Sequence, residues 1–304
     1  FKNEVAEFIY KRTYSRWREE DNRREEWPET IERFIGFITQ ERPEIPEKTQ
    51  NKIRRYMTEF AVMPSMRFLW AAGPAAKADN TTIYNCSFAK INSVDAFAEC
   101  LYVLMCGTGF GFSVEKEEID KLPAIPVIQS GQPLPRVIIE DSKAGWADSV
   151  KTLMNSLYNG QNVYFSYENI RLEGARLKTM GGRASGPAPL VKLHDFLRET
   201  MHNAQGRQLT PLEAHDICNQ IAEIVVVGGV RRSSQISLSD LDDKEMRHAK
   251  DWPYPIKRAM ANNSAIYRKK PTAAQFLTEW GSLAQSGTGE RGIFNLEAAQ
   301  NKAP

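Results

Sequence analysis

The first 60 residues place apolar side chains at helical spacing. Runs of this kind occupy residues 5–17, 27–38 and 48–62, and the proline-containing stretch "ERPEIPEK" at 41–48 separates the last two. Pro28 stands where the first turn of the second helix would begin. The pattern therefore predicts an N-terminal helical region, residues 1–60.

From residue 61 onward, short strand-like runs alternate with helical segments. The strand-like runs are 82–91, 109–115, 162–170, 234–239, 261–267 and 291–295, and the helical segments are 93–106, 141–158, 189–204, 210–229 and 272–285. Residues 121–136 carry four prolines, and we interpret them as a long loop because the alternation resumes on both sides. The alternation predicts that residues 61–304 form an α/β sheet or barrel.

Composition and charge exclude several function classes. The chain has 40 basic and 38 acidic residues, a net charge of +2, which gives no nucleic-acid or membrane signature. No apolar run approaches the roughly 18 residues of a membrane span, and the charged N-terminus does not read as a signal peptide. Four cysteines without a CxxC pair, and four scattered histidines, argue against a zinc site and for a cytoplasmic protein.

Three glycine-rich stretches stand between predicted elements. "CGTGFGF" at 106–112 leads from a helix into a strand, which is the reverse of a dinucleotide-binding fingerprint, so we reject a Rossmann interpretation. "MGGRASGP" at 180–187 and "VVVGGVRRSSQISL" at 225–238 combine glycines, arginines and hydroxyls that can bind a phosphate. By composition alone, a plain loop is an equally good interpretation of both.

Cys86 is the one cysteine placed inside a strand-like run, "IYNCSF" at 83–88. Such a residue is either a small core side chain or a working thiol. Cys100, Cys106 and Cys218 lie on apolar helical faces and are expected in the core. The residues taken one by one support only a nucleotide-handling α/β protein.

Taken together, an ordered set of motifs resembles the catalytic chain of ribonucleotide reductases, and most closely the adenosylcobalamin-dependent class II enzymes. The set runs from about residue 9 to residue 295: "YKRTYSRW", "MPSMRFLWAAG", "YNCSF", "GTGFGFSV", "EDSKAGW", "IRLEGARLKTMGGRASGP", "LTPLEAHDICNQIAEIVVVGGVRRSSQISL", "NNSAIY" and "GERGIFNL". The resemblance implies a ten-stranded α/β barrel, of which this chain holds the first half-barrel. It also implies reduction of ribonucleotides to deoxyribonucleotides by thiyl-radical chemistry, with a pair of cysteines as reductant.

The resemblance assigns roles to particular residues. Cys86 matches the first cysteine of the redox pair, and no metal ligand is implied. Substrate contacts are expected at Ser65, Asn85, Ser87, Gly109 and Asn263. The region where a deoxynucleotide or ATP effector selects the substrate is expected at Asp141, Ser142, Lys143, Arg183 and Ser185.

The family's thiyl cysteine, second redox cysteine and C-terminal phosphate loops have no counterpart in these residues. Because a half-barrel would leave an unpaired sheet edge, we expect residues 1–304 to be part of a larger unit, a longer chain or a barrel completed in trans. The expected partners are a thioredoxin-like reductant and a second copy in a homodimer. The radical source is adenosylcobalamin or, alternatively, a separate metal-containing, radical-generating subunit. The competing function is a non-catalytic nucleotide-binding module.

Overall fold

The computed structural model describes residues 1–129, 134–175, 183–227 and 234–303. The chain divides into two compact units. The first is Phe1–Asn85, and the second comprises Cys86–Ala175 and Arg183–Pro304. The predicted helical region 1–60 lies wholly inside the first unit, which continues to the residue before Cys86.

The first unit is mainly helical. Its elements are α1 (Glu4–Thr13), the hairpin β1 (Trp17–Arg18) and β2 (Arg23–Arg24), α2 (Trp27–Glu41), α3 (Glu47–Thr58), α4 (Met66–Ala71), α5 (Pro74–Ala78) and the 3-10 helix η1 (Asn80–Ile83). The three predicted helices are present as α1, α2 and α3. The backbone N–H of Glu26 donates to the carboxylate of Glu29 at 2.7 Å, and Pro28 follows in the first turn, so α2 begins where the sequence indicated.

The first unit has its own core. Its buried side chains come from helices that are separated in sequence, and they include Trp27, Ile31, Ile35, Met57 and Leu69. Arg33 donates to the carbonyls of Leu69 at 3.1 Å and Ala72 at 2.6 Å, which attaches α4 to α2. Burial of these apolar faces, with the carbonyls of α4 satisfied, makes the unit stable as a packed body.

The second unit is built on a five-stranded parallel sheet in the order β3-β4-β7-β8-β9. The strands are β3 (Cys86–Lys90), β4 (Gly109–Ser113), β7 (Gln235–Asp240), β8 (Ala261–Tyr267) and β9 (Gly292–Asn295). The predicted strand 162–170 is only partly right. It shortens to β6 (Tyr164–Ser166), which pairs with the unpredicted β5 (Arg136–Ile138) in a separate two-stranded sheet. The α/β class is confirmed.

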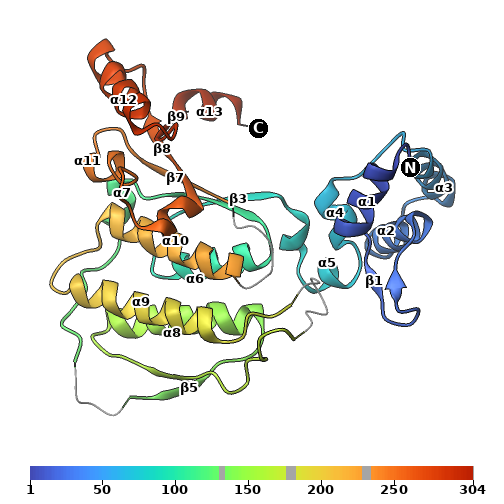
Figure 1. The fold of residues 1–304 in the computed structure, drawn as a ribbon, viewed down its shortest axis with the longest axis horizontal. Coiled ribbons are helices and arrows are strands. Elements are labelled where there is room, and N and C mark those ends of the chain that lie inside the picture. Colours follow the sequence, from blue (N-terminus) through green and yellow to red (C-terminus); the bar gives the residue numbers. More distant parts are fainter. Residues whose placement is uncertain (130–133, 176–182, 228–233, 304) are drawn as a thin grey trace. The chain divides into compact units, whose positions relative to one another are not determined.

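Helices cover one face of the five-stranded sheet in two successive layers (Figure 1). The inner layer is α6 (Asp95–Met105) and α10 (Pro211–Val227), and the outer layer is α8 (Lys143–Tyr158) and α9 (Ala188–Asn203), with β5 and β6 beyond it. Side chains from the sheet and all four helices form one core, among them Phe97, Phe112, Leu153, Leu193 and Ile217. This core fixes the sheet from one side.

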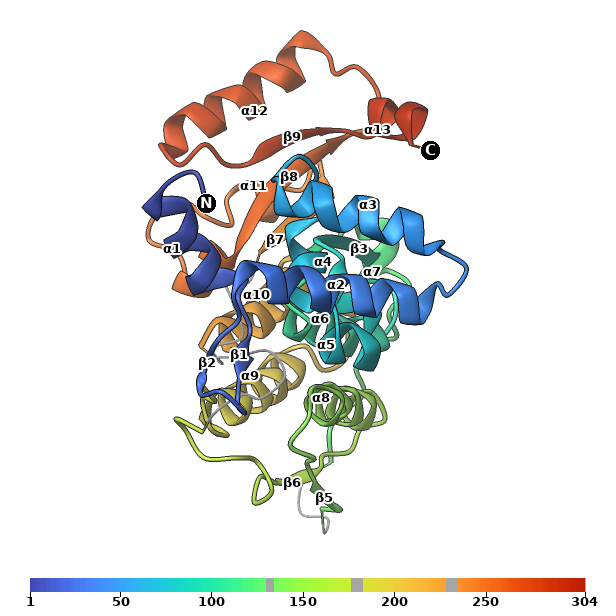
Figure 2. The ribbon, with the colours of Figure 1, turned by 90° about the vertical axis from the view of Figure 1, so that its right-hand side faces the viewer.

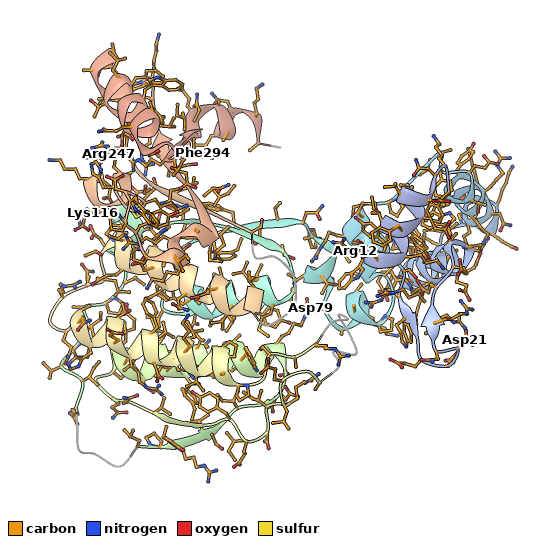
Figure 3. The ribbon with its side chains drawn as sticks, in the orientation of Figure 1. Arg12, Asp21, Asp79, Lys116, Arg247 and Phe294 are labelled. Atoms are coloured by element: carbon orange, nitrogen blue, oxygen red, sulfur yellow. The ribbon has the colours of Figure 1, made fainter. Side chains whose placement is uncertain are left out.

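The remaining elements of the second unit lie near strand ends and at its C-terminal end. They are α7 (Lys116–Ile119), α11 (Lys244–Arg247), the 3-10 helix η2 (Ile256–Met260), α12 (Ala273–Ser286) and α13 (Leu296–Lys302). Figure 2 shows α12 lying alongside β9. Most of α12 is exposed, and its one buried residue, Glu279, contacts Arg247 and Arg291. Figure 3 labels Arg247 beside the base of α12.

Among the residues that the structure describes, no helix is both long enough and apolar enough to cross a membrane.

Candidate functional site

Cys86 is the first residue of β3, and its side chain points away from the helical layers. Exposure alternates along this strand: Cys86, Phe88 and Lys90 are exposed, whereas Ser87 and Ala89 are partly buried. Ala89 packs against the core beneath the sheet. The helices α6 and α10 pack on the opposite side of the sheet, and we call the side that carries Cys86 the open face.

The strand next to β3 presents glycines to the open face. Cys86 pairs with Gly109 and Phe88 pairs with Gly111. A Cβ atom added to Gly111 would lie 3.0 Å from Cδ2 of Phe88, so the aromatic ring occupies the space above this glycine. Phe88 is 55% exposed, which leaves a thiol, an aromatic ring and bare backbone side by side.

The other residues predicted to contact substrate lie in several different places. Gly109 pairs with Cys86 on the neighbouring strand. The Ser87 hydroxyl points toward the opposite face and donates to the Gly109 carbonyl at 2.9 Å, which ties β3 to β4. Ser65 and Asn85 belong to the first unit, where the Ser65 hydroxyl accepts the N–H of Phe68 at 3.1 Å as the N-cap of α4. These four substrate assignments, and that of Asn263, remain predictions.

Asn263 lies on the helix-covered side of β8 and is only 3% exposed. Its N–H donates to the Glu290 carboxylate at 3.3 Å, and its side-chain oxygen has no hydrogen-bond partner. It lines a small pocket that is open to solvent, together with Lys250, Glu290 and Arg291. The structure does not bring Asn263 to the same face as Cys86.

Three of the five predicted effector residues, Asp141, Ser142 and Lys143, lie at the start of α8. The Ser142 hydroxyl accepts the N–H of Gly145 at 2.9 Å and caps the helix. Asp141 forms an ion pair with Arg171 at 2.6 Å. Gly145 is required here, because an added Cβ would lie 2.4 Å from the Glu140 carbonyl oxygen.

Arg183 and Ser185 are connected to this region through residues 171–175. The guanidinium of Arg183 donates to the Gly174 carbonyl at 2.9 Å, and the backbone of Ala184 donates to Ala175 at 2.7 Å. Residues 176–182, and with them Gly181 and Gly182 of the predicted loop, lie outside the described residues, as do Arg231 and Arg232. Asp141 and Arg183, from the two predicted effector segments, therefore both contact the short stretch 171–175.

Lys143 links the predicted effector region to the C-terminal end of α6. Its ammonium donates to the Cys106 thiol at 3.1 Å. Cys106 is the C-cap of α6 and stands three residues before Gly109. This contact places the start of α8 next to the turn that leads into β4.

The buried cysteines behave as core residues. Cys100 and Cys218 are fully buried, and Gln235 donates to the Cys100 sulfur at 3.5 Å and to the Cys218 carbonyl at 3.2 Å. Burial, and to a smaller extent the neighbouring Cys218, raises the pKa of the Cys100 thiol well above its usual range. This thiol therefore stays protonated and unreactive. Within the described ranges, no group of histidine, cysteine and acidic residues could hold a metal ion.

Sequence reasoning missed three residues of the open face: Phe88, Ile236 and Asn262. Ile236 is 49% exposed and pairs with both Gly111 and Asn262. The signal that could have found them is strand alternation counted from Cys86, but it needs the register between strands, which one sequence does not contain.

Comparisons with known proteins agree with the resemblance. The family model "Ribonucleotide reductase alpha domain" matches residues 1–74. The adenosylcobalamin-dependent ribonucleoside-triphosphate reductase of Euglena gracilis is 29% identical over 88% of this chain and 40% of its own length. The enzyme of the same name from Lactobacillus helveticus is 29% identical over 98% of this chain and 49% of its own length.

The fold comparison points the same way. The crystal structure of a B-12 dependent, class II ribonucleotide reductase has a TM-score of 0.82 and 23% identity, over 95% of this chain and 49% of that one. The chain therefore has the fold of about half of that enzyme, and it spans about half the length, or less, of the curated relatives named above. The predicted resemblance to ribonucleotide reductase catalytic chains is confirmed.

Proposed function

Because the chain resembles ribonucleotide reductase catalytic chains from end to end, we propose that the complete protein reduces ribonucleotides to deoxyribonucleotides for DNA synthesis. The observation that carries this proposal is Cys86: an exposed thiol at the start of β3, an outer strand of the five-stranded sheet, beside Gly109. The relatives are named as triphosphate reductases, so ribonucleoside triphosphates are the first substrates to test.

The chemistry assigned to Cys86 is that of one member of a dithiol. Replacing the ribose 2′-hydroxyl by hydrogen takes two electrons and releases water, and two thiols that become a disulfide supply those electrons. A rigid strand holds the Cys86 sulfur at a set position, and the missing side chain at Gly109 leaves room for a ribose beside it. The second thiol is proposed to come from outside residues 1–304.

Adenosylcobalamin is the proposed cofactor, since the relatives are named as dependent on it. When bound, it would supply the radical that starts the reaction. The pocket beside Asn263 is too small and too highly charged for a corrinoid, so none of the described residues is assigned as its contact. A separate radical-generating subunit remains the alternative source.

Regulation by a deoxynucleotide or ATP is proposed for the segments around Asp141 and Arg183. Their connection through residues 171–175, together with the contact between Lys143 and Cys106, supports coupling of this region to the Cys86 strand. A homodimer, a thioredoxin-like reductant and a cytoplasmic location complete the proposal.

The decisive experiment compares Cys86→Ser with Cys218→Ala in the complete protein, including any sequence that adjoins residues 1–304. We expect Cys86→Ser to abolish multiple-turnover reduction while deoxynucleotide binding, measured by equilibrium dialysis, stays intact. Cys218→Ala removes a buried thiol and should keep turnover. Turnover by Cys86→Ser would refute the role of Cys86. A wild-type protein that binds deoxynucleotides but reduces nothing would favour the non-catalytic module.

A further inference from the structure

Asn262 lies on the open face together with Cys86. Strand register places Phe88, Gly111, Ile236 and Asn262 in one row across four strands. Cys86 precedes Phe88 by two residues and therefore shares its side of the sheet. Asn262 is exposed, whereas Asn263 beside it is buried on the other side.

An asparagine inside a strand that has neighbours on both sides needs a reason, because asparagine is depleted in strands. Asn263 has one, since its backbone contacts Glu290 and it lines the small pocket. The Asn262 amide makes no hydrogen bond within the described part of the chain, and its row neighbours are apolar or glycine. It is the polar group of an otherwise apolar row.

The row suits a nucleobase better than a phosphate. Phe88 and Ile236 are 55% and 49% exposed, and they offer apolar surface to a flat ring. The row holds no cationic side chain, and the nearest one on β3, Lys90, already forms an ion pair with Glu118. An amide presents one donor and one acceptor side by side, which matches the polar edge of a base.

The separation is also compatible with a nucleotide. Three strand spacings and two residues of rise place the Cys86 and Asn262 backbones about 16 Å apart in a flat sheet. A cysteine side chain, a nucleoside and an asparagine side chain placed end to end can span that distance. We propose that Asn262 is a specificity-determining residue that hydrogen-bonds the base of the ribonucleotide whose ribose lies at Cys86. The inference rests on the proposed function.

The test measures kcat and KM of the complete protein separately for the four ribonucleoside triphosphates. Asn262→Ala should raise KM by about tenfold for some bases and much less for others, with kcat changed by less than about threefold. Asn262→Gln should recover part of the loss. Asn203→Ala, an exposed asparagine at the end of α9, is the matched control and should leave all four KM values unchanged.

Two outcomes would overturn the inference. Asn262→Ala could leave all four KM values unchanged, or shift them equally. Alternatively, Asn263→Ala could change the base preference while Asn262→Ala does not, which would place the contact on the opposite face. If the wild-type protein reduces none of the four nucleotides, the proposed function itself fails, and that result is distinct from both.

Discussion

Two buried histidines should make the second unit acid-sensitive well above the range where carboxylates titrate. His194 is on α9, and its Nε2 lies 3.0 Å from the Ser149 hydroxyl of α8 and its Nδ1 2.7 Å from the Tyr167 hydroxyl. His215 is on α10, and its Nδ1 lies 3.0 Å from the Ser237 hydroxyl of β7. Neither histidine is exposed to solvent, and neither has an acidic partner among these contacts.

Burial lowers the pKa of both imidazoles to about 3, helped by Arg198 near His194 and by Arg258, Lys250 and Lys257 near His215. In the unfolded chain each histidine has a pKa of about 6.5. The unfolded state therefore binds more protons than the native state below pH 6.5, and the free energy of unfolding falls as pH falls from 6.5 toward 3. Between pH 7 and pH 5 each histidine costs about 2 kcal/mol, and both together cost about 4 kcal/mol.

The assay is equilibrium urea unfolding at intervals from pH 7 to pH 5, a window above the ordinary carboxylate range. At the acid end the slope should approach about 2.7 kcal/mol per pH unit. His194→Gln should halve this slope whatever its effect on overall stability, and the exposed His202→Gln should leave it unchanged. In NMR titrations, His194 and His215 should stay neutral at pH 5. A flat stability profile, or a buried histidine that titrates near pH 6, would refute the reasoning.

Two further predictions concern packing and charge in the second unit. Gly145→Ala should lower the free energy of unfolding by about 1–3 kcal/mol, because the added Cβ would meet the Glu140 carbonyl. The control Gly281→Ala has open space within α12 and should raise the free energy of unfolding by up to about 1 kcal/mol. Thermal unfolding measures both variants, and equal shifts would contradict the close approach at Gly145. Glu279→Gln should lower the free energy of unfolding by about 3–5 kcal/mol, because it leaves the two arginine partners of Glu279 uncompensated. Lys116→Gln breaks an exposed ion pair and should lower it by less than about 1 kcal/mol. Equal losses of stability for the two variants in urea unfolding would contradict this.

Much of the fold could be predicted because it depends on local periodicity. The apolar spacing of α2, its Pro28 and the apolar faces of α6, α8, α9 and α10 are readable within a window of a few turns. The predictions that went wrong depended on distant pairing. Within the run 162–170, only Tyr164–Ser166 forms a strand, because only these residues pair with β5. Tyr164 pairs with Arg136, which stands 28 residues earlier in the chain.

By itself, the sequence determined the element types, the ordered motifs that resemble ribonucleotide reductase chains, and the choice of Cys86 over the three cysteines of apolar helices. Only the tertiary structure decided which side chains share a face with that thiol. Adjacent residues of a strand point to opposite sides, so the register between strands separates Asn262 from Asn263 and Cys86 from Ser87. That register is set by packing of the sheet against α6 and α10, a contact between segments far apart in the chain, and no local pattern encodes it.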